Sequence, residues 1–528
     1  MENSITITRK YTLYPELSER KEWTKKVTEF IVNSYDKKIE KCNKEFEKAN
    51  TKKEKTEIKE KLNDIIAEKQ NFLENKVITQ KIVTDYTYDM VRESMKSESA
   101  RKNMAISYVF SELINKNAQS MDYSERNKLI DDIVSYCCRI KGSKKESILD
   151  IVDIENPLGA YGFRFSQILK NKIKDMVNKD RVLEGKSSII SYKEDSPFTV
   201  SKSDMGFSHN YENFDELRAH ITDSDCRLYF NFGGNGKPTI AKFRIVMGQG
   251  RKKENKEELI STLLKIYSDE SDKYEFCGSS IGIENRKIIL NLSMKIPKQL
   301  RKLDENTVVG VDLGVAVPAM CALNNNLYVR ERIGSADEFL RVRTKLQSQR
   351  KRMQAALKNT SGGHGRSKKL KALEKLKSAE DNFVTTYCHM VSKRVVDFAL
   401  KHNAKYINIE NLNGYDTSDF ILRNWSFYKL QQDIIYKAEK YGIEVRKVNP
   451  CYTSQVCSVC GHWEEGQRKS QSVFECFDKD CKSHEIYKYG FNADFNAARN
   501  IAKSELFMKN NISVTEESKQ EAREYYKI

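Results

Sequence analysis

Hydrophobic and polar residues alternate in two stretches of the N-terminal half, and this pattern predicts β-strands. At the N-terminus, MENSITITRKYTLYP places Ile5, Ile7 and Tyr11 in an alternating strand. Between about 190 and 300 the strand-like runs are SSIISY, RLYFNF, IAKFRIVMG and RKIILNLSMKIP, with FGGNGKP as a hairpin-type loop. We therefore expect a mainly β module that flanks a helical insertion.

Within that insertion, from about 18 to 190, hydrophobic residues recur three and four positions apart and predict helices. One series runs from Trp23 to Phe46 and a second from Ile58 to Leu73, with the polar stretch NTKKEKTE between them. This arrangement predicts a helical hairpin, with a coiled coil as one form of it. Its role stays open, because a packing arm, a dimer surface and a nucleic-acid clamp all fit.

An α/β region is predicted from about Asn306 to Lys503. Its first strand, VVGVDLGVAVPAM, carries a single acid, Asp312, in a run rich in β-branched residues. One face of the strand holds Val309, Val311, Leu313 and Val315, and the other holds Gly310, Asp312, Gly314 and Ala316. A buried carboxylate is costly unless a cation or a hydrogen-bond donor meets it. The small residues beside Asp312 leave room for a metal ion or another segment of backbone.

Two more acids stand at the ends of predicted elements. Glu410 ends the strand of KYINIENL, and Asp494 precedes the alanine-rich helix of YGFNADFNAARNIAK. Three carboxylates around one pocket repel unless divalent cations hold them, and oxygen-only ligands suit Mg²⁺ or Mn²⁺. Two such ions about 4 Å apart can activate water and stabilise the leaving oxygen in phosphodiester hydrolysis. Each acid also has a structural alternative: a hydrogen bond within its own turn for Asp312, a lysine partner for Glu410 and a helix cap for Asp494.

Four of the twelve cysteines have a regular spacing. Two residues separate Cys457 from Cys460, fifteen separate Cys460 from Cys476, and four separate Cys476 from Cys481. Two paired thiolate sets at this separation suit a tetrahedral structural Zn²⁺, which stabilises folding and leaves no position open for chemistry. Because the second pair is widened, His484 or His462 remains an alternative fourth ligand. The segment lies between Glu410 and Asp494, so it can help to position Asp494.

The charge distribution points to a polyanionic partner. The chain of 528 residues has 92 Lys and Arg against 75 Asp and Glu, and such an excess favours nucleic acid. The segment from Arg341 to Lys377 contains thirteen basic residues and one acidic residue, Glu374. SGGHG divides this run into two predicted helices, and Phe383 to His402 is predicted as a third. A hairpin with charges of one sign indicates contact with a phosphate backbone.

Other functional classes fit the sequence poorly. No hydrophobic run approaches the roughly 18–20 residues that span a bilayer, and the N-terminus lacks a signal-peptide segment. The scattered cysteines do not suggest a disulfide scaffold. We therefore expect a cytoplasmic protein without a membrane partner, with a polar tail from 504 to 528 that is partly disordered.

Four motifs resemble a known family. GVDLGV, INIENL, YTSQVCSVCGH and NADFNAARNIA occur in this order, and they are similar to the RuvC nuclease of type V CRISPR effectors and of their transposon-encoded relatives, the TnpB proteins. The resemblance is specific over about residues 308–502, and the first 300 residues match in architecture only. The length of the chain fits the miniature type V-F effectors, the Cas-twelve-f group.

This resemblance implies an α+β multidomain chain with an RNase H-like (RuvC) α/β nuclease domain and an inserted zinc ribbon, plus a β wedge module interrupted by a helical recognition lobe. The implied parts are a first wedge strand (1–17), the helical lobe (18–190), the wedge (191–305), the nuclease domain (306–450) with its basic hairpin (341–377), the zinc-ribbon or target-strand-loading insertion (451–490), the last nuclease helix (491–503) and the tail (504–528).

It further implies functional residues and partners. Asp312, Glu410 and Asp494 would be the catalytic triad that binds Mg²⁺, and Cys457, Cys460, Cys476 and Cys481 would bind Zn²⁺. A member of the family would use a guide RNA, read a short flanking motif on target double-stranded DNA, cut single strands in sequence at one RuvC site and form a homodimer on one RNA. Because base pairing supplies the specificity, such a protein needs only backbone contacts and a short duplex reader.

The chain is therefore predicted to be an RNA-guided, Mg²⁺-dependent DNA endonuclease of a CRISPR system. A TnpB-type nuclease guided by a transposon-end RNA has the same chemistry and is the first alternative. A non-cleaving RNA-guided DNA-binding protein is the second, and the loss of an acid would indicate it, but all three acids are present.

Overall fold

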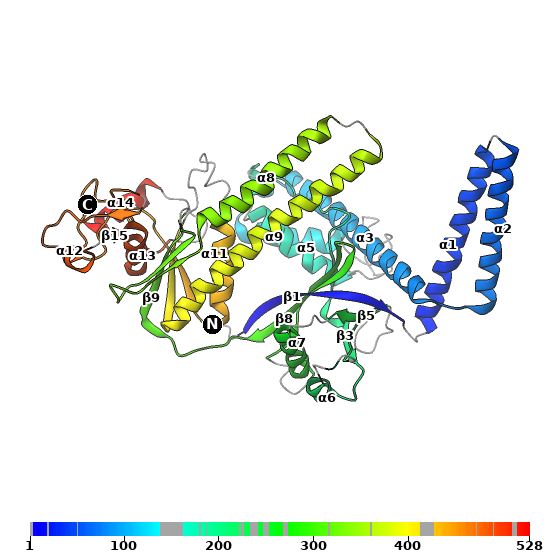
Figure 1. Cartoon of the computed structure of the whole chain (residues 1–528), viewed down its shortest axis with the longest axis horizontal. Coiled ribbons are helices and arrows are strands. Elements are labelled where there is room, and N and C mark those ends of the chain that lie inside the picture. Colours follow the sequence, from blue (N-terminus) through cyan, green and yellow to red (C-terminus); the bar gives the residue numbers. More distant parts are fainter. Residues whose placement is uncertain are drawn as a thin grey trace. The chain divides into compact units, whose positions relative to one another are not determined.

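The chain is an α+β protein, as predicted, and it divides into two compact units, Ser4–Pro297 and Lys298–Ile528 (Figure 1). A computed structural model describes residues 4–17, 21–49, 51–137, 162–178, 181–185, 187–220, 223, 226–232, 241–246, 253–267, 273–314, 317–359, 362–411, 427–470, 472–488, 490–508 and 515–528. Within the described part of the chain, no helix is long and apolar enough to cross a membrane.

The first unit contains an antiparallel eight-stranded sheet in the order β2-β7-β8-β1-β5-β4-β3, with β6 paired to β8. The N-terminal strand β1 (Ser4–Glu16) lies between β8 (Lys287–Pro297) and β5 (Ala241–Val246). Its alternation buries Ile5 and Ile7 in the core, so the predicted joining of the first strand to the later ones is confirmed. The other strands are β2 (Phe198–Val200), β3 (Met205–His209), β4 (Leu228–Phe232), β6 (Glu275–Phe276) and β7 (Ser279–Glu284).

One expectation for this β region is wrong, and two of its helices were not predicted. SSIISY, residues 187–192, forms no strand. Between the strands lie two helices, α6 (Phe214–Ala219) and α7 (Lys253–Ile266). Leu259 and Leu263, four residues apart and both buried, give α7 the helical period that the alternating reading overlooked. The loop FGGNGKP lies almost entirely outside the described residues.

The predicted helical hairpin is present. Helix α1 (Lys21–Lys48) is followed by α2 (Lys52–Asn75), whose start is fixed by a capping box between Thr51 and Glu54. An ion pair between Lys69 and Asp36, 2.6 Å long, joins the two helices. A separate hydrophobic cluster is formed by parts of α3 (Gln80–Asn115), α4 (Tyr123–Cys137) and α5 (Gly162–Asn178).

The second unit is built on a five-stranded sheet in the order β11-β10-β9-β12-β13. The first three strands, β9 (Asp304–Asp312), β10 (Ala319–Leu323) and β11 (Arg330–Ile333), are antiparallel, whereas β12 (Ala404–Glu410) runs parallel to β9 and to β13 (Glu444–Val448). A two-stranded sheet joins β14 (Val473–Phe474) to β15 (Phe491–Asn492).

Helices cover both faces of the five-stranded sheet. Val309 and Val311 point into a core with α9 (Gly363–Lys401) and α11 (Phe427–Lys440). The opposite face of β9 meets α13 (Ala493–Lys503). Successive residues of a strand point to opposite faces, and this alternation places Gly310 and Asp312 on the α13 side.

One helical prediction for this unit needs correction. SGGHG does separate two helices, α8 (Ala336–Lys358) and α9, but no third helix begins at Phe383, because α9 continues from Gly363 to Lys401. The sequence between these helical periods contains neither proline nor glycine to end the helix. The described part of the tail includes a helix that was not predicted, α14 (Glu516–Tyr526), which begins with a capping box between Thr515 and Ser518. Its small residue Ala522 is buried.

Candidate active site

Two of the predicted acids end neighbouring parallel strands. The register of β9 and β12 pairs Val311 with Ile409, so the next residues, Asp312 and Glu410, stand at the same end of the sheet. Because the carboxyl ends of parallel strands meet at one edge, the topology brings together two acids that are far apart in the sequence.

The third acid arrives on a helix. Asp494 lies in the first turn of α13, with 13% of its side chain exposed. Asn492, and not Asp494, caps this helix by accepting a hydrogen bond of 2.9 Å from the backbone N–H of Phe495. The helix-cap alternative for Asp494 is therefore wrong. An acid in the first turn is nonetheless favourable to the helix dipole.

The backbone of helix α13 packs directly against β9 at Gly310. A Cβ atom on Gly310 would lie 2.0 Å from the carbonyl oxygen of Ala498 and 2.3 Å from the backbone nitrogen of Ala502. The prediction that the small face of this strand admits another backbone is therefore confirmed. From β12, the Asn408 side chain donates a 2.9 Å hydrogen bond to the Ile501 carbonyl and so holds the other end of α13.

The three carboxylates share one electrostatic environment. Burial raises the pKa of Asp312 well above its ordinary value, and the charges of Glu410 and Asp494 raise it further. Burial also raises the pKa of Glu410, to about 7, and the pKa of Asp494. In the described part of the chain, only the four cysteines form a group of possible ligands whose atoms all lie within 4.8 Å of one another. The carboxylate oxygens of the three acids are therefore farther apart than the four sulfur atoms.

Arg468 contributes a cation to this cluster, and sequence reasoning missed it. Its positive charge lowers the pKa of all three acids, against the effect of burial. Its Nη2 lies 3.9 Å from Oδ1 of Asp494. Arg468 lies in the cysteine-containing segment, far in sequence from each strand acid, and no motif or spacing marked it. Only the folding of that segment back onto α13 reveals it.

Two polar side chains hold Glu410. The Thr453 hydroxyl donates a 2.7 Å hydrogen bond to Oε1 of Glu410, and the Gln431 amide donates a 2.9 Å bond to its carbonyl oxygen. Both Thr453 and Gln431 are buried. The described partner of this carboxylate is therefore a threonine, where the structural alternative had suggested a lysine.

The four regularly spaced cysteines come together beside α13. The Sγ atoms are 3.8 Å apart for Cys457 and Cys481 and 3.5 Å apart for Cys460 and Cys476. A tetrahedral Zn²⁺ with bonds of about 2.3 Å places its sulfur ligands roughly 3.8 Å apart. The donor set therefore fits a zinc ion.

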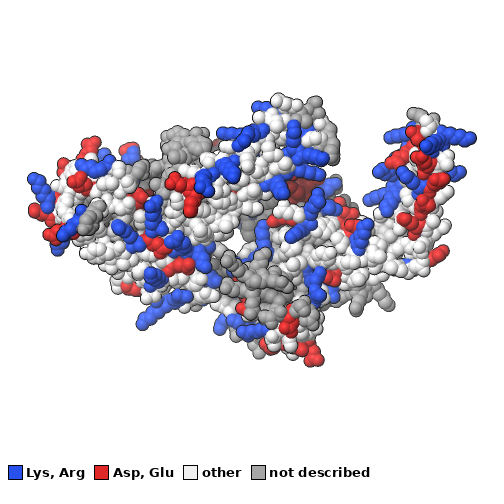
Figure 2. Space-filling view, in the orientation of Figure 1, with Lys and Arg blue, Asp and Glu red and all other residues white. Residues whose placement is uncertain are grey.

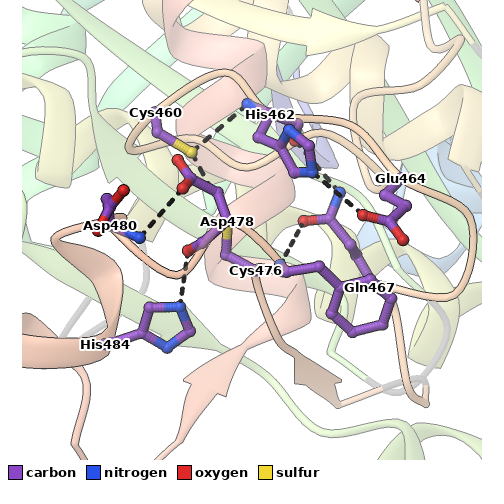
Figure 3. A network of polar contacts seen from close by, with 9 residues as sticks. Cys460, His462, Glu464, Gln467, Cys476, Asp478, Asp480 and His484 are labelled. Carbon is purple, nitrogen blue, oxygen red and sulfur yellow. Dashed lines mark hydrogen bonds and ion pairs between the residues drawn. The ribbon is translucent and has the colours of Figure 1, made fainter.

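Backbone N–H groups support the sulfurs, and the two histidines considered as ligands bond elsewhere. The N–H groups of His462 and Ser483 point to Cys460 and Cys481, each at 3.4 Å. Figure 3 shows that the His462 ring reaches Glu464 and that the His484 ring reaches the carbonyl of Asp478. The geometry thus favours Cys481 over either histidine as the fourth ligand.

This segment is bonded directly to the helix that carries Asp494. The side chain of Asn496 accepts a 2.8 Å hydrogen bond from the backbone N–H of Ser458 and donates another of 2.8 Å to the carbonyl of Val456. Phe495 and Phe474 join Cys457 in one hydrophobic cluster. Helix α13 therefore holds Asp494 and is also bonded to the segment that carries the four cysteines.

The basic hairpin α8–α9 uses some of its charges internally. Glu380, which is buried, pairs with Arg343 at 3.4 Å and with Arg350 at 2.8 Å. Arg366 and Lys369 donate to backbone carbonyls near the end of α8. Other basic residues of this hairpin are exposed, and Figure 2 shows such side chains along it; they include Arg341, Lys345, Lys351, Arg352, Lys358, Lys368, Lys371, Lys375 and Lys377.

Comparison with known proteins gives a consistent result. The model of the Cas12f1-like TNB domain matches residues 427–501. The CRISPR-associated endodeoxyribonuclease Cas12f1 of Sulfoacidibacillus thermotolerans is 36% identical over 329 residues, which cover 61% of this chain and 71% of the relative. The Cas12f1 of Syntrophomonas palmitatica is 37% identical over 226 residues, or 38% of this chain and 45% of that protein. A TnpB-like protein of Methanocaldococcus jannaschii is 35% identical over 152 residues, or 26% of this chain and 52% of that protein.

A solved structure agrees at the level of the fold. The Cas12f1 chain of a complex with single guide RNA and target DNA matches with a TM-score of 0.60 and 21% identity, covering 96% of this chain and all of that one (100%). Fold and sequence thus indicate a CRISPR effector nuclease. The chain belongs to the Cas12f family of CRISPR-associated endodeoxyribonucleases, so the predicted family is confirmed.

Proposed function

We propose that this chain is an RNA-guided DNA endonuclease of a CRISPR system that hydrolyses phosphodiester bonds at one site, made by Asp312, Glu410 and Asp494 with Mg²⁺ or Mn²⁺. One observation carries the assignment of the residues: two neighbouring strand ends and one helix start bring three acids so close that each of the other two raises the pKa of Asp312. Such mutual repulsion is relieved when divalent cations bind.

We assign the five-stranded sheet to an RNase H-like (RuvC) domain formed by residues 306–450 and 491–503. Three antiparallel strands followed by two parallel ones, in the order β11-β10-β9-β12-β13, support this assignment. The family membership and the placing of the acids at one edge of the sheet support it as well.

The residues of the chain have distinct roles in this proposal. Bound divalent cations would supply an activated water and charge neutralisation at the leaving oxygen. Asp312 and Glu410 would hold them at the sheet edge, and Asp494 would hold them from α13. Arg468, whose charge already acts on all three acids, would offset the negative charge that develops on the phosphate. Thr453 and Gln431 would keep Glu410 in position.

We further propose that Cys457, Cys460, Cys476 and Cys481 bind a structural Zn²⁺ in a ribbon formed by residues 451–490. The sulfur separations and the two N–H···S contacts support this. A closed four-thiolate site has no open position, and we therefore assign it to folding and to the positioning of α13 and Arg468.

The proposed partners are a guide RNA and target double-stranded DNA. The solved Cas12f1 complex is named for a single guide RNA and target DNA. The exposed basic side chains of the α8–α9 hairpin suit contact with a nucleic-acid backbone. The family resemblance also implies a homodimer on one guide RNA, and the mass of the reconstituted complex tests this.

The TnpB-type function is the second candidate, because a TnpB-like protein also matches. That match covers less of both chains than the match to a Cas12f1 does. Sequencing the RNA that co-purifies from the native locus separates the two. Different spacers on one shared scaffold identify a CRISPR effector, whereas a single transposon-end RNA identifies the TnpB type.

The assignment of the acids is tested with Asp312→Ala in the reconstituted complex. We expect guided cleavage to fall by at least about a thousandfold, since a ligand shared by the cations is lost, while binding to target DNA is retained. Glu305→Ala removes an exposed acid of the same strand and is the matched control, with unchanged cleavage. Undiminished cutting by Asp312→Ala would remove Asp312 from the mechanism.

A further inference from the structure

After α13 the chain runs back beside β13, the edge strand of the five-stranded sheet. The backbone N–H of Asn449 donates to the carbonyl of Leu506, and that of Met508 donates to the carbonyl of Lys447, each at 2.9 Å. Val448 and Phe507 form an antiparallel bridge. The segment after α13 thus lies beside the end of β13, where the turn 449–456 begins.

Helix α14 then binds that turn. The Asn449 side chain donates a 2.7 Å hydrogen bond to the carbonyl of Ser518, and Arg523 donates one of 2.8 Å to the Tyr452 hydroxyl. Each contact joins α14 to a residue within four positions of Thr453.

Helix α13 binds the same turn. The Asn500 amide donates to the carbonyls of Thr453, at 2.8 Å, and Val456, at 2.7 Å. The turn is therefore bonded both to the helix that carries Asp494 and to α14.

The side chain of Thr453 points from this turn to Glu410. It is 1% exposed, and its hydroxyl lies 2.7 Å from Oε1 of Glu410. The same hydroxyl lies 2.9 Å from the carbonyl of Pro450, so its single proton has two acceptors within reach, of which the Glu410 oxygen is the nearer.

Helix α14 also carries Tyr526, whose hydroxyl is influenced electrostatically by Glu410. The hydroxyl of Tyr526 is buried. Burial raises the pKa of Tyr526, and the neighbouring charge of Glu410 contributes to the rise.

We propose that Thr453 is a positioning residue for Glu410 and that α14 is the clamp that holds it there, so that metal binding at the nuclease site depends on the last helix of the chain. The inference rests on the proposed role of Glu410 as a metal ligand. A group that orients a ligating carboxylate changes metal affinity or activity by about 10–100-fold when it is lost. The C-terminal helix therefore has a function beyond the packing of the tail.

Thr453→Val tests the first half, because it keeps the shape of the side chain and removes the hydroxyl. The rate of guided cleavage is measured over a range of Mg²⁺ concentrations. We expect the concentration for half-maximal rate to rise about tenfold, with target-DNA binding unchanged. Thr453→Ser keeps the hydroxyl and restores the parental value, which a loss of packing alone would not do.

Arg523→Ala tests the clamp by removing one contact between α14 and the turn. We expect the Mg²⁺ requirement to rise in the same direction and by a smaller factor, about three- to fivefold. Glu517→Ala, an exposed position of the same helix, is the matched control and leaves the requirement unchanged. Deletion of residues 515–528 shows the largest shift where the shortened chain still melts cooperatively and binds its guide RNA.

The outcomes distinguish this inference from the proposed function. If Glu410→Ala abolishes cleavage but Thr453→Val and Arg523→Ala have the parental Mg²⁺ requirement, the clamp is wrong and the assignment of Glu410 stands. If Glu410→Ala cleaves normally, the proposed site itself is wrong. A raised requirement in Thr453→Val that Thr453→Ser restores, together with the same change in Arg523→Ala, supports the clamp.

Discussion

Gly310 and Asp312 lie two residues apart on one face of β9, and the role of each depends on the other. The missing side chain of Gly310 lets α13 touch the strand, and only this close approach brings Asp494 near enough for its charge to act on Asp312. A metal site made from a strand and a helix needs such a contact, because carboxylate side chains are short.

Gly310→Ala therefore tests whether the site needs the close packing of α13 on β9, and it leaves all three acids unchanged. A Cβ atom 2.0 Å from the Ala498 carbonyl would force α13 away from β9, and overpacking of this kind costs about 1–3 kcal/mol. We expect a lower free energy of unfolding in denaturant titration and a loss of cleavage of at least tenfold.

Gly365→Ala is the control for this variant, because a Cβ atom there meets nothing within 4 Å. Alanine favours a helix over glycine, so this variant should be as stable as the parent or slightly more so. Parental stability and cleavage in Gly310→Ala would contradict the tight contact between α13 and β9.

The residues that sequence reasoning identified are those whose own segment carries a pattern. Asp312 and Glu410 interrupt hydrophobic strands, Asp494 precedes a periodic helix, and the cysteines have a spacing. Arg468 and Thr453 carry no such pattern, and their relation to the acids exists only once the turn 449–456 and the cysteine segment have folded onto α13. Contacts of this kind depend on tertiary structure and leave no periodic trace in the sequence.

At the scale of elements, some basic residues of the hairpin α8–α9 form ion pairs within the hairpin, and others are exposed to solvent. The buried Glu380 orders the hairpin by pairing with Arg343 and Arg350, so these two arginines are not available in full for a ligand. Exposed residues such as Lys351, Lys371 and Lys375 are the ones positioned to meet phosphate.

The salt dependence of nucleic-acid binding tests this division. Each phosphate contact contributes about 0.9 to the slope of log K against log salt on duplex DNA. Replacing Lys351, Lys371 and Lys375 together by alanine should therefore reduce the slope by about 2–3 and weaken binding similarly for all sequences. Glu374→Ala, which removes an acid of the hairpin, should not reduce the slope. An unchanged slope in the triple variant would place the nucleic acid elsewhere.

Helices and strands were predicted well where one period of hydrophobic residues continues along a segment. They were predicted less well where a strand period changes to a helix period. The strands β1, β4, β5 and β8 match alternating runs, and the α1–α2 hairpin matches its two helical series. Helix α7 was overlooked because it lies between strands. Helix α14 was overlooked because it contains few hydrophobic residues, and Ala522 is the residue that it buries.

At the scale of the whole molecule, the chain consists of two units with separate hydrophobic cores. The four-thiol group belongs to the second unit alone, Lys298–Ile528. A structural metal stabilises only the unit that folds around it, because its binding free energy is part of that unit's folding free energy. Two units with separate cores are also expected to depart from a single two-state transition.

Calorimetry of the purified chain, with and without a zinc chelator, tests this organisation. We expect about one zinc per chain and two unfolding transitions, of which the chelator lowers only the one that belongs to the second unit. Cys476→Ser should have the same effect, whereas Cys451→Ser, a cysteine of the same unit outside the cluster, should leave both transitions near their parental temperatures. Because the cysteine segment is bonded to α13 through Asn496, loss of zinc should also reduce cleavage more than guide-RNA binding. A chelator that lowered the transition of the first unit instead would contradict both the metal assignment and the independence of the two cores.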